Sequence, residues 1–182
     1  MQIPVAGFDP SFTNWGIAEG QLDLDTGYLE NVRLEIVSTE KGKAKQVRTN
    51  SDDLQRCEEL ARKALEVGRR CKAIFVEVPV GSQNASGMKA YGVVCGILGT
   101  LRAEGIQIIE VTPTEVKKTF TGNKNATKEQ MIAQAVQLYP DANFPMHRGQ
   151  IASKAEHVAD ALAAIHAGVS TPIFQNLLRI LR

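Results

Sequence analysis

The chain has 182 residues, of which 43% are hydrophobic and 23% are charged. These values are typical of one ordinary globular domain, which is long enough to bury a core without disulfide bridges. The three cysteines include no CxxC pair, which argues against a disulfide scaffold or a structural zinc site and favours a reducing compartment. No secretory signal pattern and no apolar run of about 18 residues is present. We therefore expect a soluble, intracellular protein.

The net charge is +1, and a nearly neutral total argues against a strong nucleic-acid binder. The charges are unevenly distributed, however. Residues 1–40 carry a net charge of −6, and residues 41–182 carry +7. The small net charge is therefore the sum of an acidic N-terminal part and a basic remainder, and a nucleic acid would attract the basic part.

The first forty residues read as strands. Three short segments have either an apolar run or alternating apolar and polar residues, and turn residues separate them: 3–9, 15–20 and 28–37. This pattern predicts an antiparallel meander of three strands. Residues 38–50 are polar and basic and predict a loop. Ser51 then opens an amphipathic helix with two aspartates in its first turn.

The rest of the chain alternates strands and helices. Residues 73–78 and 106–111 are β-branched apolar runs that predict buried strands, with a helix over 88–104 between them. Capping signals then predict further helices, and these begin at Thr112, Thr127, Ser153 and Thr171. The last helix is predicted over about 171–181.

The predicted order is β-β-β-α-β-α-β-α-α-α. It indicates an α/β fold with a five-stranded mixed sheet, in which three antiparallel strands precede parallel strands and helices cover both faces. No internal repeat is visible, so residues 1–182 are predicted to form one domain. The connecting segments that we expect to be mobile are 38–50, 79–87, 120–126 and 141–153.

Acidic residues stand at the ends of two predicted strands. Asp9 ends the first strand and Glu77 lies near the end of the fourth, so adjacent central strands would place them side by side. Their repulsion would be unfavourable without a cation, and hard oxygen ligands suit Mg²⁺ or Mn²⁺. His157 and Asp160 lie three residues apart on one face of a late helix.

Each of these residues also has an ordinary structural explanation. Asp9 precedes Pro-Ser and could be a turn former, and Glu77 could be a surface residue at a strand end. His157 could pack or cap, and Asp160 could lie on a solvated helix face. The chemical signal comes from the four residues as a set.

Four segments in order resemble the RuvC Holliday-junction resolvases of the retroviral-integrase/RNase H-like superfamily, over residues of about 3–168. They are GFDPSFTNWGIA, AIFVEVP, VTPTEVKKTFTGNKNATKEQM and AEHVADALAAIHAG. The DPS of the first segment is similar to the phage-type branch. The resemblance implies a metal-dependent endonuclease that cuts four-way DNA junctions, located in the cytoplasm of a bacterium or of a phage-infected host.

The resemblance also implies residue roles. Two Mg²⁺ ions per site, which Mn²⁺ could replace, would be held by Asp9, Glu77, His157 and Asp160. Lys117 and Lys128 match the family's functional lysines and would contact phosphates. Lys118 and Lys124 would be auxiliary backbone contacts, although a solvated basic face explains any single lysine equally well.

The loop after the second segment departs from the family pattern. The family can place an aromatic wedge there, whereas this chain has Val80. Ser82, Gln83 and Asn84 could contact bases or backbone instead. Glu156 is assigned to the capping box of Ser153 rather than to the site, and Trp15 is assigned to the core.

Two cuts in a junction of near-twofold symmetry require two active sites, so a homodimer is expected. Glycines in the helix over 88–104 would permit close helix–helix approach. The alternatives are a nuclease with a broader range of branched DNA, such as flaps and forks, and a non-catalytic junction-binding protein. A sugar-kinase or actin-like ATPase is a further alternative, but the chain has no convincing glycine-rich phosphate loop.

Overall fold

A five-stranded mixed sheet forms the centre of the computed structural model, which describes residues 1–42 and 48–181. The strand order is β3-β2-β1-β4-β5. β1 pairs antiparallel with β2 and parallel with β4, and the bounds of the strands are β1 Gln2–Asp9, β2 Asn14–Asp23, β3 Leu29–Ser38, β4 Ala73–Glu77 and β5 Ile108–Val111. The predicted α/β fold with three antiparallel strands followed by parallel ones is confirmed. Residues 43–47 of the predicted loop lie outside the described residues.

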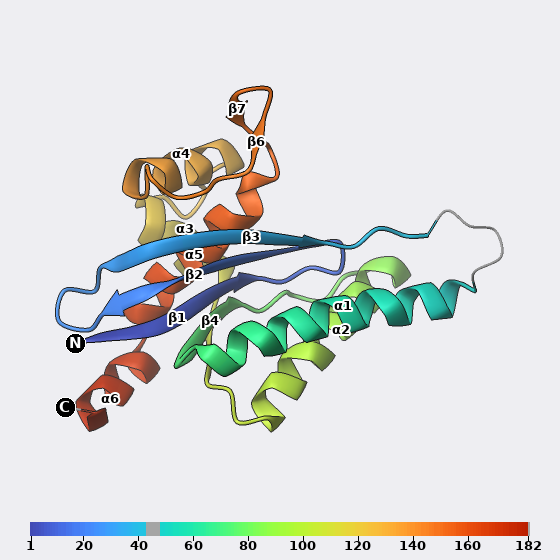
Figure 1. Cartoon of the computed structure of the whole chain (residues 1–182), viewed down its shortest axis with the longest axis horizontal. Coiled ribbons are helices and arrows are strands. Elements are labelled where there is room, and N and C mark those ends of the chain that lie inside the picture. Colours follow the sequence, from blue (N-terminus) through green and yellow to red (C-terminus); the bar gives the residue numbers. More distant parts are fainter. Residues whose placement is uncertain (43–47, 182) are drawn as a thin grey trace.

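Helices cover both faces of this sheet (Figure 1). α1 (Thr49–Arg70) and α2 (Ala85–Ala103) pack on one face, and α5 (Ala155–Val169) packs on the other, flanked by α3 (Pro113–Thr121), α4 (Lys128–Leu138) and α6 (Pro172–Leu181). Because strand side chains alternate between the faces, each strand contributes to two separate cores. None of the helices in the described part of the chain combines the length and apolar character that crossing a bilayer requires.

Two of the three predicted capping boxes are present. Thr112 and Thr127 each accept a hydrogen bond from the third helical N–H, and Glu115 and Gln130 reciprocate. The predicted box at Ser153 is wrong. The first free N–H groups of α5 already donate to the backbone carbonyls of residues 152 and 153, so the helix begins at Ala155 without a side-chain cap.

A two-stranded hairpin between α4 and α5 was not predicted. β6 (Met146–His147) pairs antiparallel with β7 (Gln150–Ile151), within the segment 141–153 that the sequence assigned to a mobile loop. Strands of two residues leave no period in the sequence, and an Arg-Gly turn is not a strong hairpin signal. α1 and α2 also begin earlier than predicted, at Thr49 and Ala85.

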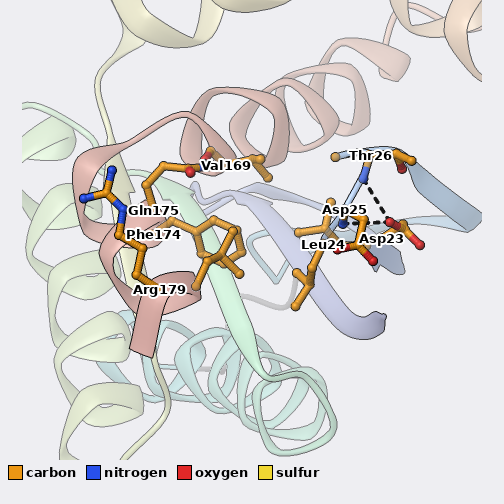
Figure 2. A pocket seen from close by; sticks show the side chains of 11 residues that line it. Asp23, Leu24, Asp25, Thr26, Val169, Phe174, Gln175 and Arg179 are labelled. Atoms are coloured by element: carbon orange, nitrogen blue, oxygen red, sulfur yellow. Dashed lines mark hydrogen bonds between the residues drawn. The ribbon is translucent and has the colours of Figure 1, made fainter. Parts of the chain in front are cut away.

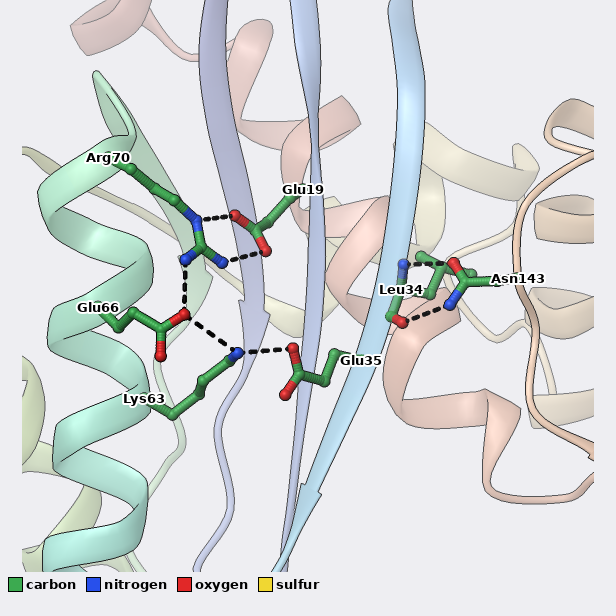
Figure 3. Close-up of polar contacts among 7 residues, drawn as sticks. All are labelled: Glu19, Leu34, Glu35, Lys63, Glu66, Arg70 and Asn143. Carbon is green, nitrogen blue, oxygen red and sulfur yellow. Dashed lines mark hydrogen bonds and ion pairs between the residues drawn. The ribbon is translucent and has the colours of Figure 1, made fainter.

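Ion pairs connect α1 to the acidic meander (Figure 3). Arg70 binds both carboxylate oxygens of Glu19 on β2, at 2.6 and 2.7 Å, and also contacts Glu66 at 2.6 Å. Lys63 lies 2.8 Å from Glu35 on β3. The acidic excess of residues 1–40 is therefore partly neutralised within the fold, on the face that α1 covers.

Two glycines let α5 approach the sheet closely. A Cβ on Gly7 would lie 1.9 Å from the carbonyl oxygen of Ala161, and a Cβ on Gly16 would lie 2.1 Å from that of His157. Both distances are far below van der Waals contact. The backbone of α5 therefore rests directly on β1 and β2, which fixes where its side chains reach the sheet.

We expect Gly7→Ala to destabilise the protein by about 3 kcal/mol or more, because α5 must move away from β1. The matched control is Gly81→Ala in the loop after β4, where the nearest atom to a Cβ would be the sulfur of Met88 at 3.5 Å, an ordinary contact. That change should alter the free energy of unfolding by less than about 1 kcal/mol, since no backbone atom blocks the added methyl group. Urea unfolding of both variants measures the difference, and equal free energies of unfolding would contradict this account of the packing.

Candidate active site

Four polar side chains meet at the carboxyl ends of β1 and β4. Asp9 is the last residue of β1 and Glu77 is the last residue of β4. The parallel register pairs Phe8 with Val76, so the two acids follow at the same level of the sheet. The first turns of α5 bring His157 and Asp160 to this place, because the helix crosses β1 and β2 there.

Asp9 and His157 are in direct contact. The Nδ1 atom of His157 lies 2.9 Å from Oδ2 of Asp9. The hydrogen bond to this carboxylate raises the pKa of His157 above its usual value, against the opposing effect of burial. In this arrangement Nδ1–H donates to Asp9, and the proton is held between the end of β1 and the start of α5.

The other two carboxyl groups are strongly perturbed. Burial, followed by the negative charge of Asp9, raises the pKa of Glu77 to about 7. Burial, followed by the charges of Asp9 and Glu77, raises the pKa of Asp160 to about 7 as well. Each acid is thus destabilised as an anion, first by burial and then by its charged neighbours, and a bound cation would relieve this.

The donor set suits a divalent metal ion. Three carboxylates and one imidazole are ligands that Mg²⁺ and Mn²⁺ accept, with the imidazole favouring the transition metal. The side chains lie near one another but are not arranged as ligands of a single ion. Within residues 1–42 and 48–181, no group of three or more His, Cys, Asp or Glu side chains is placed to hold a metal ion. The donors therefore fit a divalent cation by their chemistry and by their mutual repulsion.

The predicted lysines surround this site at different distances. Lys117 on α3 lies close enough for its charge to lower the pKa of Glu77. Lys128, the first residue of α4, places its Nζ 2.6 Å from Oε2 of Glu156. Lys118 and Lys124 are exposed at the end of α3 and in the loop after it. Lys117 and Lys128 therefore border the acids, at Glu77 and at Glu156 respectively.

Glu156, which the sequence assigned to a capping box, lies beside the candidate site instead. Its carboxylate pairs with Lys128, lies 3.7 Å from Nε2 of His157 and contributes to the raised pKa of Asp160. The spacing from Ser153 matched a capping box and concealed this position. Its place directly before His157, in a helix that turns toward the acids, was the available signal.

In the loop after β4, some of the predicted DNA-contacting residues are exposed and others have partners within the fold. Val80 is 78% exposed, as an apolar wedge would require. The side chain of Asn84 caps α2 by accepting from the N–H of Gly87 at 2.8 Å, and its amide donates to Oγ of Ser82. Ser82 and Asn84 thus have structural partners, whereas Gln83 is exposed.

A buried arginine supports the segment that follows Asp9. Arg56 of α1 donates to the carbonyl oxygen of Phe12 at 3.3 Å and to Oγ1 of Thr39 at 3.1 Å. Its guanidinium also lies 3.8 Å from the centroid of the Phe12 ring. Arg56 therefore fixes the turn that carries the chain from β1 into β2, beside the site.

A cavity of about 400 Å³ lies away from these residues (Figure 2). It is lined by the turn after β2 and by α6. Asp23 pairs with Gln2 at the start of β1, at the end of the sheet opposite to Asp9. Oδ1 of Asp23 accepts from the N–H groups of Asp25 and Thr26, so this carboxylate organises a turn.

The raised pKa values predict a specific pH dependence of stability without added metal. Because the pKa of Asp160 is higher in the fold than in the unfolded chain, its ionisation costs free energy, and this cost grows from about pH 4 to pH 7. Asp160→Asn should therefore stabilise the metal-free protein by roughly 2–4 kcal/mol at pH 8 and by little at pH 4. Thermal unfolding in EDTA at both pH values measures this. If Asp160→Asn changes the stability equally at both pH values, or lowers it at pH 8, the electrostatic explanation is wrong.

Two solved structures of Thermus thermophilus RuvC resemble this chain. One, described as RuvC in complex with Holliday junction substrate, has a TM-score of 0.65, is 22% identical and covers 96% of each chain. The other, described as the RuvC structure, has a TM-score of 0.64, is 25% identical and covers 92% of this chain and 95% of its own. No protein-family model matches the chain, and no curated protein sequence matches it.

The similarity extends over nearly the whole chain and includes the mixed sheet with helices on both faces. It agrees with the four sequence segments that resemble RuvC resolvases, and that resemblance is confirmed at the level of the fold. The chain therefore has the RuvC type of the RNase H-like fold.

Proposed function

We propose that this protein is a metal-dependent endonuclease that cleaves four-way DNA junctions. The observation that carries the proposal is the meeting of Asp9, Glu77, His157 and Asp160 at one end of a RuvC-like sheet, with the pKa of both Glu77 and Asp160 raised to about 7. A set of mutually destabilised carboxylates is unfavourable for a purely structural role. The DNA substrate is argued from the similar RuvC that was solved with a Holliday junction.

The acids would act as the ligands of divalent metal, with Asp9 central because it neighbours both Glu77 and His157. Mg²⁺ or Mn²⁺, two per site, would supply activation of the attacking water and stabilisation of the leaving 3′ oxygen. Glu77 comes to Asp9 from β4, and Asp160 comes from α5. His157 holds a proton toward Asp9 and would either bind metal through nitrogen or orient the water.

The lysines would hold the DNA strand. Lys117 lies beside Glu77, where a phosphate next to the cleaved bond would come. Lys128 is paired with Glu156, so a phosphate must compete with this carboxylate. Lys118 and Lys124 would add contacts to the backbone that depend on salt. The binding surface is thus concentrated in the segment 117–128.

A second candidate is a nuclease with a broader range of branched DNA. Val80 stands where the resembled family can carry an aromatic wedge, and its side chain is 78% exposed. A smaller wedge unstacks bases less effectively. This favours a substrate range that includes flaps and forks, whereas a non-catalytic junction-binding role would leave the raised pKa values of the acids unexplained.

We further propose that the enzyme acts as a homodimer, because a junction of near-twofold symmetry needs two sites for two cuts. α2 offers a surface for it. A Cβ on Gly92, Gly96 or Gly99 would meet nothing within 4 Å, and Met88 on the same helix is 45% exposed. These features permit another helix to approach the backbone of α2.

Asp9→Asn should lower the rate of cleavage of a synthetic four-way junction in Mg²⁺ by at least about 10³-fold. The reason is that it removes the central negative charge from the proposed metal-ligand set. Binding of the junction should remain, since no lysine changes. Gel assays for cleavage and for binding measure the two effects separately. The control is Arg62→Asn, which changes an exposed side chain on α1 and should cleave the junction at the parent's rate.

The same assay separates the candidates. Junctions, flaps, forks and linear duplex are compared, with Mg²⁺ and with Mn²⁺. Equal cleavage of flaps and junctions favours the broader nuclease. Full cleavage by the Asp9→Asn variant would overturn the site assignment, and absence of cleavage in both metals with tight binding would favour the non-catalytic role.

A further inference from the structure

The β6–β7 hairpin is an excursion from the core that sits next to the candidate site. All six of its residues, 146–151, are exposed, whereas Phe144 before it and Ala155 after it are buried. Figure 1 shows it extending away from the body beside α4 and the start of α5. Burial of apolar surface therefore does not explain why the chain leaves the core here.

The base of the hairpin is nevertheless well anchored. Asn143 forms two hydrogen bonds with the backbone of Leu34 on the edge strand β3, both at 2.8 Å (Figure 3). The N–H of Ala152 donates to the carbonyl oxygen of Pro145, which extends the ladder toward the core. A segment that is fixed at its base and free at its tip can hold a defined position in front of the body.

One face of the hairpin is turned toward α4. Ile151 lines a cavity of about 710 Å³ together with Ile132 of α4, and Lys128 and Glu156 line the same cavity. Because strand side chains alternate, the pair His147 and Gln150 faces the other way. The hairpin therefore stands beside the Lys128–Glu156 pair.

The tip of the hairpin is an Arg-Gly turn. Arg148 has φ of 50° and Gly149 has φ of 79°, the combination of a type I′ turn, for which Asn-Gly is the preferred sequence. Arginine is a poor choice for this backbone. Among the described residues no ion pair or hydrogen bond of its side chain is present, so the fold offers no reason for a cation there.

We propose that the β6–β7 hairpin is a DNA-binding finger that contacts the duplex arm next to the cleaved strand, with Arg148 on the phosphate backbone. This inference rests on the proposed function. A two-stranded ribbon fits the major groove of duplex DNA. From Ile151 to Arg148 an extended chain spans at most roughly 10 Å, so the tip can stand about that far out from the α4 surface beside which Ile151 lies.

Charge supports duplex DNA as the partner. Lys154 follows the hairpin and is exposed, and Lys128 stands beside its base. Lys154 and Arg148 thus place cationic groups at the base and the tip of the hairpin, whereas Lys128 is paired with Glu156. Because Arg148 would contact phosphate and not base edges, its contribution should be similar for different sequences and should fall with salt.

The test measures binding of a four-way junction in EDTA, where no strand is cut, over a range of salt concentrations. Arg148→Asn removes the charge while suiting the turn better than arginine, and Arg148→Lys keeps the charge. Arg62→Asn, which removes an exposed arginine from α1 on the opposite face of the sheet, is the matched control. Hydroxyl-radical footprints of the junction arms accompany the titrations.

Arg148→Asn should weaken binding roughly tenfold and lower the slope of log Kd against log salt by about one. Protection of one arm should be lost, while Arg148→Lys and Arg62→Asn bind as the parent does. If the Kd of Arg148→Asn for the junction equals that of Arg62→Asn, the proposed DNA-binding role of the hairpin is wrong, even if the parent cuts junctions. A parent that neither prefers nor cuts branched DNA would instead overturn the proposed function.

Discussion

The close packing of α5 on the sheet is the constraint on which the candidate site depends. Gly7 and Gly16 remove the side chains that would hold the helix away from β1 and β2. As a result, Asp160 is brought near Asp9 and Glu77 in a poorly solvated place, and the pKa of Glu77 and of Asp160 rises to about 7. The packing that stabilises the fold thus creates the electrostatic repulsion that a cation would relieve.

The nearly neutral net charge of the chain is explained by where its charged residues lie: some stabilise the fold and others lie near the candidate site. Glu19 and Glu35, from the acidic first forty residues, are paired with Arg70 and Lys63 of α1. On the other side of the sheet, Lys117 lies near Glu77, and Lys118 and Lys124 are exposed without ion pairs among the described residues. A small net charge is therefore compatible with a local DNA-binding surface.

The sequence predicted the sheet and its mixed topology, because strand periodicity and capping residues are local signals, and the strand-end acids made Asp9, Glu77, His157 and Asp160 candidate ligands. It failed where long-range packing decides. Glu156 has the spacing of a cap from Ser153, but the chain enters α5 from a hairpin and its carboxylate turns to Lys128. The hairpin itself is fixed by Asn143 on the distant strand β3, a contact that no local pattern reveals.

The crowded carboxylates of Asp9, Glu77 and Asp160 are proposed to form a divalent metal site. Isothermal titration calorimetry with Mn²⁺ and Mg²⁺ near pH 7, in two buffers of different ionisation enthalpy, counts the protons released on binding. Because the pKa of Glu77 and that of Asp160 are about 7 in the metal-free protein, the account predicts binding with proton release that fades toward pH 9. Absence of binding, or binding without proton release at pH 7, would contradict it.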